Sequence, residues 1–134
     1  QSTRGEWPCD QIYTMNSDGS VVRRVSTGKG RTTCSYFLPN GQHFIYSSTH
    51  LGGEACPPKP DYSRGYVWSL EKDYDIFLSD FSGKLERLTT TPGYDAEATI
   101  SPDGKNIVFT SIRDGDLELY SMKTDGTVDW EGST

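Results

Sequence analysis

Two groups of acidic side chains have the residue types and spacing to bind a cation. Tyr94, Asp95 and Glu97 are close together in the sequence, and they could accept a metal cation, a peptide amine or an arginine of a partner. Alternatively, they bond backbone amides of their own connection. Asp114 and Asp116 are separated by one glycine, which is compatible with calcium. A tight turn is the more typical reading of Asp-Gly-Asp between strands, and we predict a turn there.

The other reactive side chains are three cysteines (Cys9, Cys34 and Cys56) and two histidines. No two cysteines have the C-x-x-C spacing of zinc sites, so a metal site from the cysteines and His50 is only an alternative interpretation. Neither His50 nor His43 has an evident nucleophile partner, and no hydrolase-elbow, phosphate-loop or zinc-protease motif occurs. The sequence therefore predicts no catalytic residue, no cofactor and no metal. Three cysteines in a small acidic chain favour an oxidising compartment.

The composition favours short strands over helices. Hydrophobic residues make up 33% of the 134 residues, and 14 glycines and 7 prolines separate brief apolar segments. The mean hydropathy is −0.65. A net charge of −6 argues against a nucleic-acid partner, because phosphate binding requires a concentrated basic face. No apolar run is long enough to insert into a membrane.

The elements that would position these side chains come from an internal repeat. Strand-and-turn segments beginning at residues 11, 75 and 118 read QIYTMNSDGS, DIFLSDFSGK and ELYSMKTDGT. Two further segments, LPNGQHFIYSS (38–48) and SPDGKNIVFTS (101–111), place a Pro-x-Gly turn before a strand. Asp or Asn followed by Gly supplies the positive φ angles that a tight hairpin needs. The last two copies begin 43 residues apart, which is the length of a four-stranded propeller blade.

These segments resemble the WD40-like repeat, also called PD40. That repeat occurs in TolB-type β-propellers and in the propeller domains of tricorn-like and prolyl-oligopeptidase-like peptidases. The resemblance rests on SPDGKNIVFTS, ELYSMKTDGT and RLTTTPGYD, and it covers residues 10 to about 128 outside an insertion at 49–73. It implies an all-β fold of four-stranded antiparallel blades. A closed propeller has about four to eight blades, and this chain has copies for about two and a half, so we expect a partial propeller.

The repeat divides the chain into four expected parts. They are an N-terminal extension (1–9), the outer half of a first blade (10–31), a second blade (32–94) with the inserted loop 49–73, and a third blade (95–134) that need not be complete.

Propeller geometry would place the blade-to-blade connections and the insertion on one face. Cys34 aligns with Glu97 at the start of an innermost strand, and Cys56 lies in the insertion. We therefore expect a Cys34–Cys56 disulfide that fastens the insertion, with Cys9 free or paired outside the chain. Reduced, buried cysteines are the alternative.

The same face is the expected binding surface. Aromatic side chains of the insertion could contact a partner or could cover the edge of their own blade. The expected binding residues are Arg31, Tyr62, Tyr66, Trp68, Tyr94, Asp95 and Glu97.

The resemblance and the cysteines together imply a bacterial protein that is periplasmic or secreted. We expect a non-catalytic propeller segment that acts as a protein-binding or scaffold module. Its partners would be a protein or peptide, together with the remaining blades or other copies of the chain. Two alternatives stay open: the propeller of a peptidase whose catalytic domain lies outside this chain, and a subunit of a homomeric assembly of partial propellers.

Overall fold

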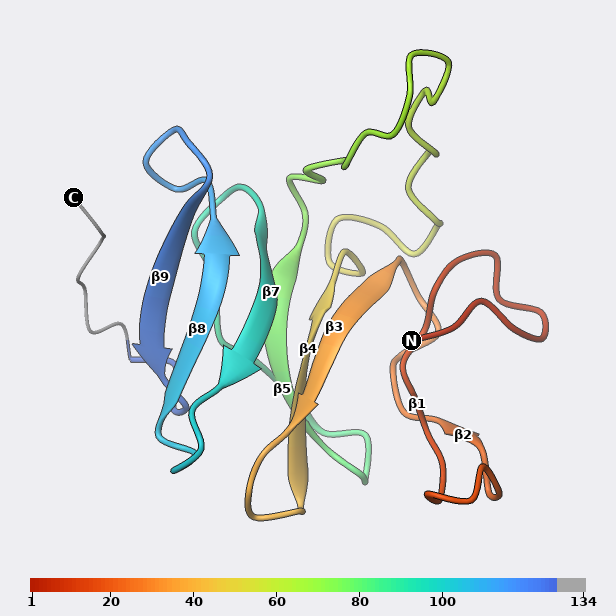
Figure 1. Cartoon of the computed structure of the whole chain (residues 1–134), viewed down its shortest axis with the longest axis vertical. Coiled ribbons are helices and arrows are strands. Elements are labelled where there is room, and N and C mark those ends of the chain that lie inside the picture. Colours follow the sequence, from red (N-terminus) through yellow and green to blue (C-terminus); the bar gives the residue numbers. More distant parts are fainter. Residues whose placement is uncertain (128–134) are drawn as a thin grey trace.

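Residues 1–127, which the computed structural model describes, form three antiparallel sheets one after another along the chain (Figure 1). The sheets have the strand orders β1-β2, β3-β4-β5-β6 and β7-β8-β9. The strands are β1 (Tyr13–Thr14), β2 (Arg23–Arg24), β3 (Thr32–Phe37), β4 (His43–Ser48), β5 (Asp75–Asp80), β6 (Leu85–Arg87), β7 (Asp95–Ile100), β8 (Asn106–Ser111) and β9 (Glu118–Lys123). The described residues contain no helix that could cross a membrane. The all-β fold of antiparallel propeller blades is confirmed.

The Pro-x-Gly segments form the hairpins that their residues predict. Leu38 N donates to the carbonyl oxygen of His43 at 2.9 Å, and Gly41 closes the turn with a φ of 66°. The equivalent hairpin of the next sheet is closed in the same way, since Ser101 N donates to the carbonyl oxygen of Asn106 at 2.9 Å. The repeated sequence pattern therefore corresponds to a repeated hairpin, between β3 and β4 in the second sheet and between β7 and β8 in the third.

The four-stranded sheet is covered on both faces because side chains alternate along its central strand β4. Ile45 belongs to the apolar cluster shared with the β7–β9 sheet, which includes Ile107. Phe44 and Tyr46 point the other way, into a cluster that includes Ile12 near β1. Burial of each such side chain contributes roughly 1.5–3 kcal/mol. The four-stranded sheet thus buries one face against the β7–β9 sheet and the other toward β1, as propeller blades do.

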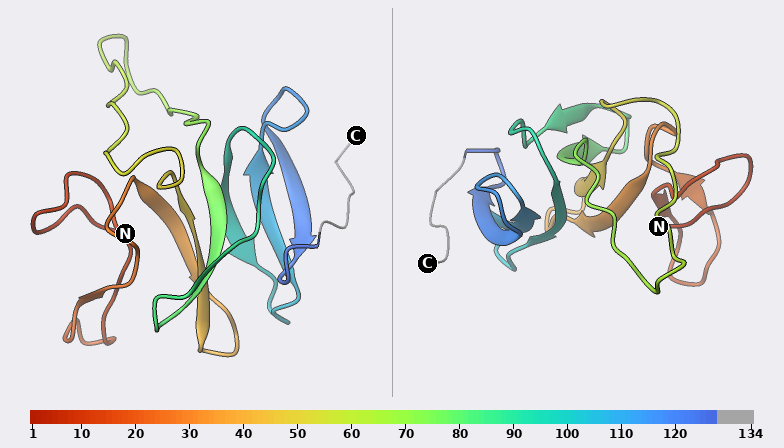
Figure 2. Two further views of the ribbon diagram at one scale, coloured as in Figure 1. Left: turned by 180° about the vertical axis from the view of Figure 1, so that it is seen from behind. Right: turned by 90° about the horizontal axis from the view of Figure 1, so that it is seen from above.

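The last sheet is buried on one face only. In β8, Ile107 and Phe109 are fully buried, whereas Val108 between them is 40% exposed. Leu119 on β9 is 60% exposed. Viewed from above, the sheets follow one another across the molecule, and the β7–β9 sheet lies at one end (Figure 2).

The innermost strands β3 and β7 share a β-bulge at matching positions. The register shifts between Thr33 and Tyr36 in β3, and between Ala96 and Thr99 in β7. Cys34 and Glu97 occupy these two bulges with φ angles of 48° and 51°. This left-handed conformation is uncommon for residues other than glycine. The alignment of Cys34 with Glu97 in the sequence therefore corresponds to the same strained backbone in both sheets.

The insertion 49–73 leaves the end of β4 and projects from one end of the molecule (Figure 1). The expected Cys34–Cys56 pairing is wrong. The disulfide joins Cys9 to Cys56, with their Cα atoms 5.8 Å apart, and Cys34 is a free, half-buried thiol. The physical reason is that the N-terminal segment runs alongside the start of β3, where Thr32 N donates to the carbonyl oxygen of Asp10 at 3.0 Å. This hydrogen bond places Cys9, rather than Cys34, beneath the insertion.

Candidate binding site

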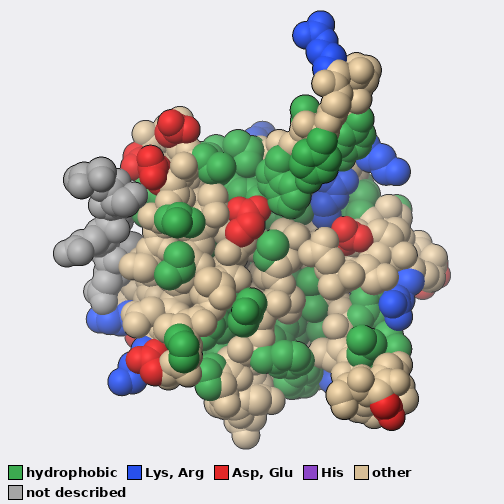
Figure 3. Space-filling view, viewed as in Figure 1, with side chains coloured by type: hydrophobic (Ala, Val, Ile, Leu, Met, Phe, Trp, Pro, Cys, Tyr) green, Lys and Arg blue, Asp and Glu red, His purple; other side chains and the backbone are tan. Residues whose placement is uncertain are grey.

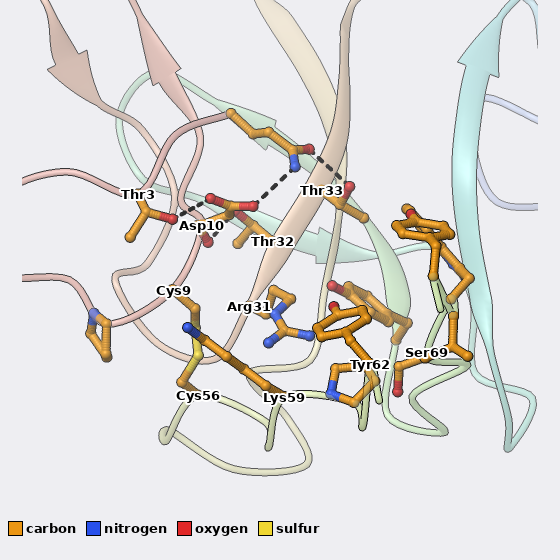
Figure 4. Close-up of a pocket in the computed structure, with 17 residues that line it drawn as sticks. Thr3, Cys9, Asp10, Arg31, Thr32, Thr33, Cys56, Lys59, Tyr62 and Ser69 are labelled. Atoms are coloured by element: carbon orange, nitrogen blue, oxygen red, sulfur yellow. Dashed lines mark hydrogen bonds between the residues drawn. A yellow bond between two sulfur atoms is a disulfide. The ribbon is translucent and has the colours of Figure 1, made fainter. Parts of the chain in front are cut away.

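A pocket of about 420 Å³ lies beneath the insertion (Figure 4). Its walls come from three segments that are far apart in the sequence: the N-terminal residues 1–10, the residues 31–33 at the start of β3, and residues 56–69 of the insertion. Tyr74, just before β5, also lines it. Two of the three walls lie outside the repeat, so the pocket is not a feature that every blade would have.

The N-terminal wall is held together by polar contacts around Asp10. Both carboxylate oxygens of Asp10 accept hydrogen bonds, one from the Thr3 hydroxyl and one from the Gln1 side-chain amide. The carbonyl oxygen of the Gln1 side chain accepts in turn from the Thr33 hydroxyl at 2.8 Å and from the Cys34 amide at 3.2 Å. These contacts join the N-terminal segment to β3 and satisfy the one carboxylate in this wall.

The base of the insertion is fastened to the connection that precedes β3. Besides the Cys9–Cys56 disulfide, Gly30 N donates to the carbonyl oxygen of Glu54 at 2.9 Å. Lys29 also forms an ion pair with Glu54, between two exposed side chains. An exposed pair of this kind contributes at most about 1 kcal/mol. The disulfide is therefore a stronger fastening than the ion pair.

Arg31 stands at the centre of the pocket wall. Arg31 N donates to the Thr49 hydroxyl at 3.0 Å, and Thr49 N donates to the carbonyl oxygen of Arg31 at 3.1 Å. These two bonds fix Arg31 just before the start of β3. Its guanidinium donates one bond of 3.3 Å to the carbonyl oxygen of Pro57. In Figure 4 the Arg31 side chain points into the pocket, with Lys59 and Tyr62 on the insertion side and Thr33 on the strand side.

The aromatic side chains of the insertion are exposed. The exposed fractions are 52% for Tyr62, 79% for Tyr66 and 55% for Trp68, and the rings of the two tyrosines stack with centroids 6.4 Å apart. In the space-filling view, hydrophobic side chains gather along this projecting segment with basic side chains beside them (Figure 3). An exposed apolar surface on an anchored segment is typical of a recognition site.

Trp68 also connects the insertion to the next sheet. Its indole N–H donates to the Tyr94 hydroxyl at 2.9 Å, and the Tyr94 hydroxyl donates to the Glu97 carboxylate. Burial raises the pKa of Tyr94 above its ordinary value, and the hydrogen bond to Glu97 raises it further. Burial raises the pKa of Tyr74 as well, although Arg31 opposes this effect. Both tyrosine hydroxyls therefore remain protonated donors at neutral pH.

Of the expected binding residues, the structure brings Arg31, Tyr62, Tyr66 and Trp68 together in the pocket wall. Tyr94 and Glu97 lie outside the lining: Tyr94 contacts the lining residues Trp68 and Tyr74, and Glu97 accepts a hydrogen bond from Tyr94.

Asp95 is placed differently. It is buried, and its carboxylate accepts a bond of 3.1 Å from the guanidinium of Arg113, which is also buried. Asp95 therefore forms a buried ion pair, and its carboxylate does not line the pocket.

The second acidic group, at Asp114 and Asp116, forms a turn. Gly115, with a φ of 103°, donates its N–H to the carbonyl oxygen of Ile112 at 3.0 Å, and Asp116 accepts from the amide of Leu117 at 2.7 Å. Over residues 1–127, no group of three or more His, Cys, Asp or Glu side chains is arranged to hold a metal ion.

The pocket residues that were not expected from the sequence include Gln1, Asp10, Lys59 and Tyr74. Gln1 and Asp10 lie near the N-terminus, where no repeat pattern indicates a role. The one sequence signal for this wall is that Asp10 directly follows Cys9. That signal becomes informative once Cys9 is known to pair with Cys56 in the insertion.

Comparison with known proteins agrees on the fold. A protein named TolB homolog from Chlorobium chlorochromatii is 27% identical in an alignment of 126 positions that covers 77% of this chain. The Tol-Pal system protein TolB of Bordetella pertussis is 43% identical over 42 residues, 31% of this chain. A structure assigned to TolB of Agrobacterium tumefaciens superposes on 91% of this chain with a TM-score of 0.67 and 23% identity. The fold is that of a TolB-like β-propeller.

The TolB-like relatives are longer than this chain. It spans 29% of the Chlorobium protein, 10% of the Bordetella protein and 40% of the Agrobacterium chain. No family model matches it. The relatives and the structural neighbour thus show a TolB-like propeller, whereas the assignment to the PD40 repeat stays a prediction.

Proposed function

We propose that this chain is part of a non-catalytic, extracytoplasmic β-propeller that binds a protein or peptide partner in the pocket beneath the insertion. The pocket itself is the observation that carries the proposal. It combines exposed aromatic rings with an arginine and a lysine, and it is anchored by a disulfide. Aromatic and arginine side chains held on a rigid support are the residues that dominate binding in protein interfaces.

The relatives and the disulfide support the rest of the proposal. The Bordetella relative is named a Tol-Pal system protein, and this name supports a protein partner. The Cys9–Cys56 disulfide supports a periplasmic or secreted location, because disulfides persist in oxidising compartments.

We also infer that the bare face of the β7–β9 sheet packs against a further propeller blade. Val108 and Leu119 are exposed there, although they stand next to the buried side chains of Ile107, Phe109 and Tyr120. The structural neighbour is a longer TolB-like chain, of which this chain covers 40%. Apolar residues that one blade cannot bury alone are buried by the next.

Selection of peptides from a random displayed library on the purified protein tests the binding proposal. The informative variant replaces residues 60–70 with a short Gly-Ser linker, which removes Tyr62, Tyr66 and Trp68 but keeps Cys56 and its disulfide. A Met15→Ala variant is the control, because Met15 is exposed far from the pocket lining. We expect the wild type and the control to select the same peptides and the shortened protein to lose them. Equal selection by the shortened protein would contradict the proposed site.

A further inference from the structure

The charge inside the pocket is opposite in sign to that of the molecule. The chain carries a net charge of −6, so its overall field favours cationic partners. The pocket is lined by two basic side chains, Arg31 and Lys59, and by one acidic side chain, Asp10. Asp10 is already satisfied on both carboxylate oxygens by Thr3 and Gln1. The one carboxylate of the lining is therefore occupied, and Arg31 and Lys59 remain as its charged donors.

These donors lack anionic partners. Within residues 1–127, no carboxylate oxygen lies within 4 Å of the charged nitrogens of Arg31 or Lys59, whereas Arg87 and Arg113 both have an aspartate partner. Arg31 is half-buried and uses one donor, on Pro57. A guanidinium has five N–H donors in a planar fork that fits a carboxylate with two parallel bonds. Partial burial strengthens such a pair, because water screens it less.

Tyr74 supplies a further donor in the same wall. It is buried, and no hydrogen-bond partner for its hydroxyl is found in the described part of the chain. Because the hydroxyl stays protonated at neutral pH, it can donate to an anion. The pocket thus offers a guanidinium, an ammonium and a phenol, next to the exposed rings of Tyr62 and Tyr66.

We propose that the pocket binds the Asp or Glu side chains of an extended acidic peptide segment, and this inference rests on the proposed function. Arg31 and Lys59 bind the carboxylates, and the rings of the insertion contact the neighbouring side chains of the peptide. The two cations come from different walls of the pocket, Arg31 from the segment that leads into β3 and Lys59 from the insertion. Two separate cations match two side-chain carboxylates of one segment better than they match the single carboxylate of a peptide C-terminus.

The same random-peptide selection tests this inference through the composition of the peptides, displayed without a free C-terminus. The test variant is Arg31→Gln with Lys59→Gln. The matched control is Lys84→Gln with Lys105→Gln, because both lysines are exposed in turns outside the pocket and the change in net charge is identical. Lys59→Gln alone is the second variant, since Lys59 is exposed and its loss does not endanger folding.

We expect Asp and Glu to be enriched over the input library with the wild type and with the control, and not with the pocket double variant. A selected peptide should bind the Lys59→Gln protein about tenfold more weakly, as the loss of one charge-assisted contact predicts. Its Asp→Asn and Glu→Gln version should lose binding to the wild type.

The other outcomes are distinguishable. Selected peptides without acidic enrichment, or acidic enrichment that survives the pocket double variant, would overturn this inference and leave the proposed function standing. Binding that requires a free C-terminus, found with a second library that provides one, would overturn the assignment to side chains. Selection of no peptide at all would overturn both the inference and the proposed function.

Discussion

Trp68 and Tyr94, 26 residues apart in the sequence, are joined by a hydrogen bond of 2.9 Å from the indole N–H to the phenol oxygen. Because Tyr94 lies between β6 and β7, this bond fastens the far end of the insertion to the next sheet. The Cys9–Cys56 disulfide fastens the near end to the N-terminal segment. The insertion is therefore held at two points on either side of the pocket, and its aromatic side chains are positioned without any strand of their own.

A double-mutant cycle measures the first fastening. Trp68→Phe removes the N–H donor and Tyr94→Phe removes the acceptor, while both keep an aromatic ring. We expect a coupling free energy of about 0.5–1.5 kcal/mol from urea unfolding of the two single variants and the double variant. We also expect faster amide hydrogen exchange in the insertion of each variant. A coupling free energy of zero would show that this bond does not fasten Trp68 of the insertion to Tyr94.

Substitutions of the paired and the free cysteines should differ in their effect on stability, because the disulfide joins Cys9 to Cys56 and leaves Cys34 free. It closes a loop of 47 residues, so its loss should lower the free energy of unfolding by up to about 4 kcal/mol. Cys56→Ser should be destabilised by this amount under non-reducing conditions, and Cys34→Ser should be nearly neutral. Mass spectrometry of a non-reduced digest should show a peptide joining Cys9 to Cys56, with Cys34 alkylated. A linked peptide containing Cys34 would contradict the structure.

The strands could be predicted from the sequence, but the course of the insertion could not. The short apolar run Phe44, Ile45 and Tyr46 and the Pro-x-Gly turn before it are local signals, and they specify a hairpin wherever it lies. The insertion has no such periodicity, because its position is set by contacts at Cys56 and Trp68 with residues far away in the sequence.

The expected and the observed cysteine pairs differ for the same reason. Alignment of the repeats correctly matched Cys34 with Glu97, and the structure gives both residues the same bulge. That alignment says nothing about the N-terminal residues, which have no counterpart in the other copies. Their attachment to the edge of β3 brings Cys9 and Asp10 under the insertion. The N-terminal wall of the pocket therefore could not be predicted from the repeat.

Gly30 is expected to tolerate no side chain. Its φ is 59°, and a Cβ placed on it would lie 2.7 Å from the Thr49 hydroxyl and 2.8 Å from the backbone nitrogen of His50. Gly41 is the matched control, because its φ of 66° is similar and a Cβ placed on it would have no other atom within 4 Å. Gly41→Ala should cost roughly 1–2 kcal/mol for the left-handed backbone alone. Gly30→Ala should cost clearly more, by thermal or urea unfolding, and an equal cost would mean that the contact with Thr49 and His50 is loose.

Asp75 should make the stability of the protein depend on pH in a direction unusual for an aspartate. Burial raises its pKa above the ordinary value of 3.8, and the hydrogen bond and charge of Arg87, 2.8 Å away, offset this only in part. A carboxyl group whose pKa is higher in the folded state binds its proton more tightly there than in the unfolded chain. Its contribution to stability is therefore fully present below pH 3.8 and is lost as the pH rises through the folded-state pKa.

Asp75→Asn tests this sign, because the amide stays neutral at every pH. The stability of the Asp75→Asn protein relative to wild type should rise as the pH increases from below 3.8 to neutrality, as measured by urea unfolding at a series of pH values. Asp80→Asn should behave in the opposite way, because hydrogen bonds from Ser82 lower the pKa of the Asp80 carboxyl group. Its stability relative to wild type should fall over the same range. Parallel curves for the two variants would show that burial does not dominate at Asp75.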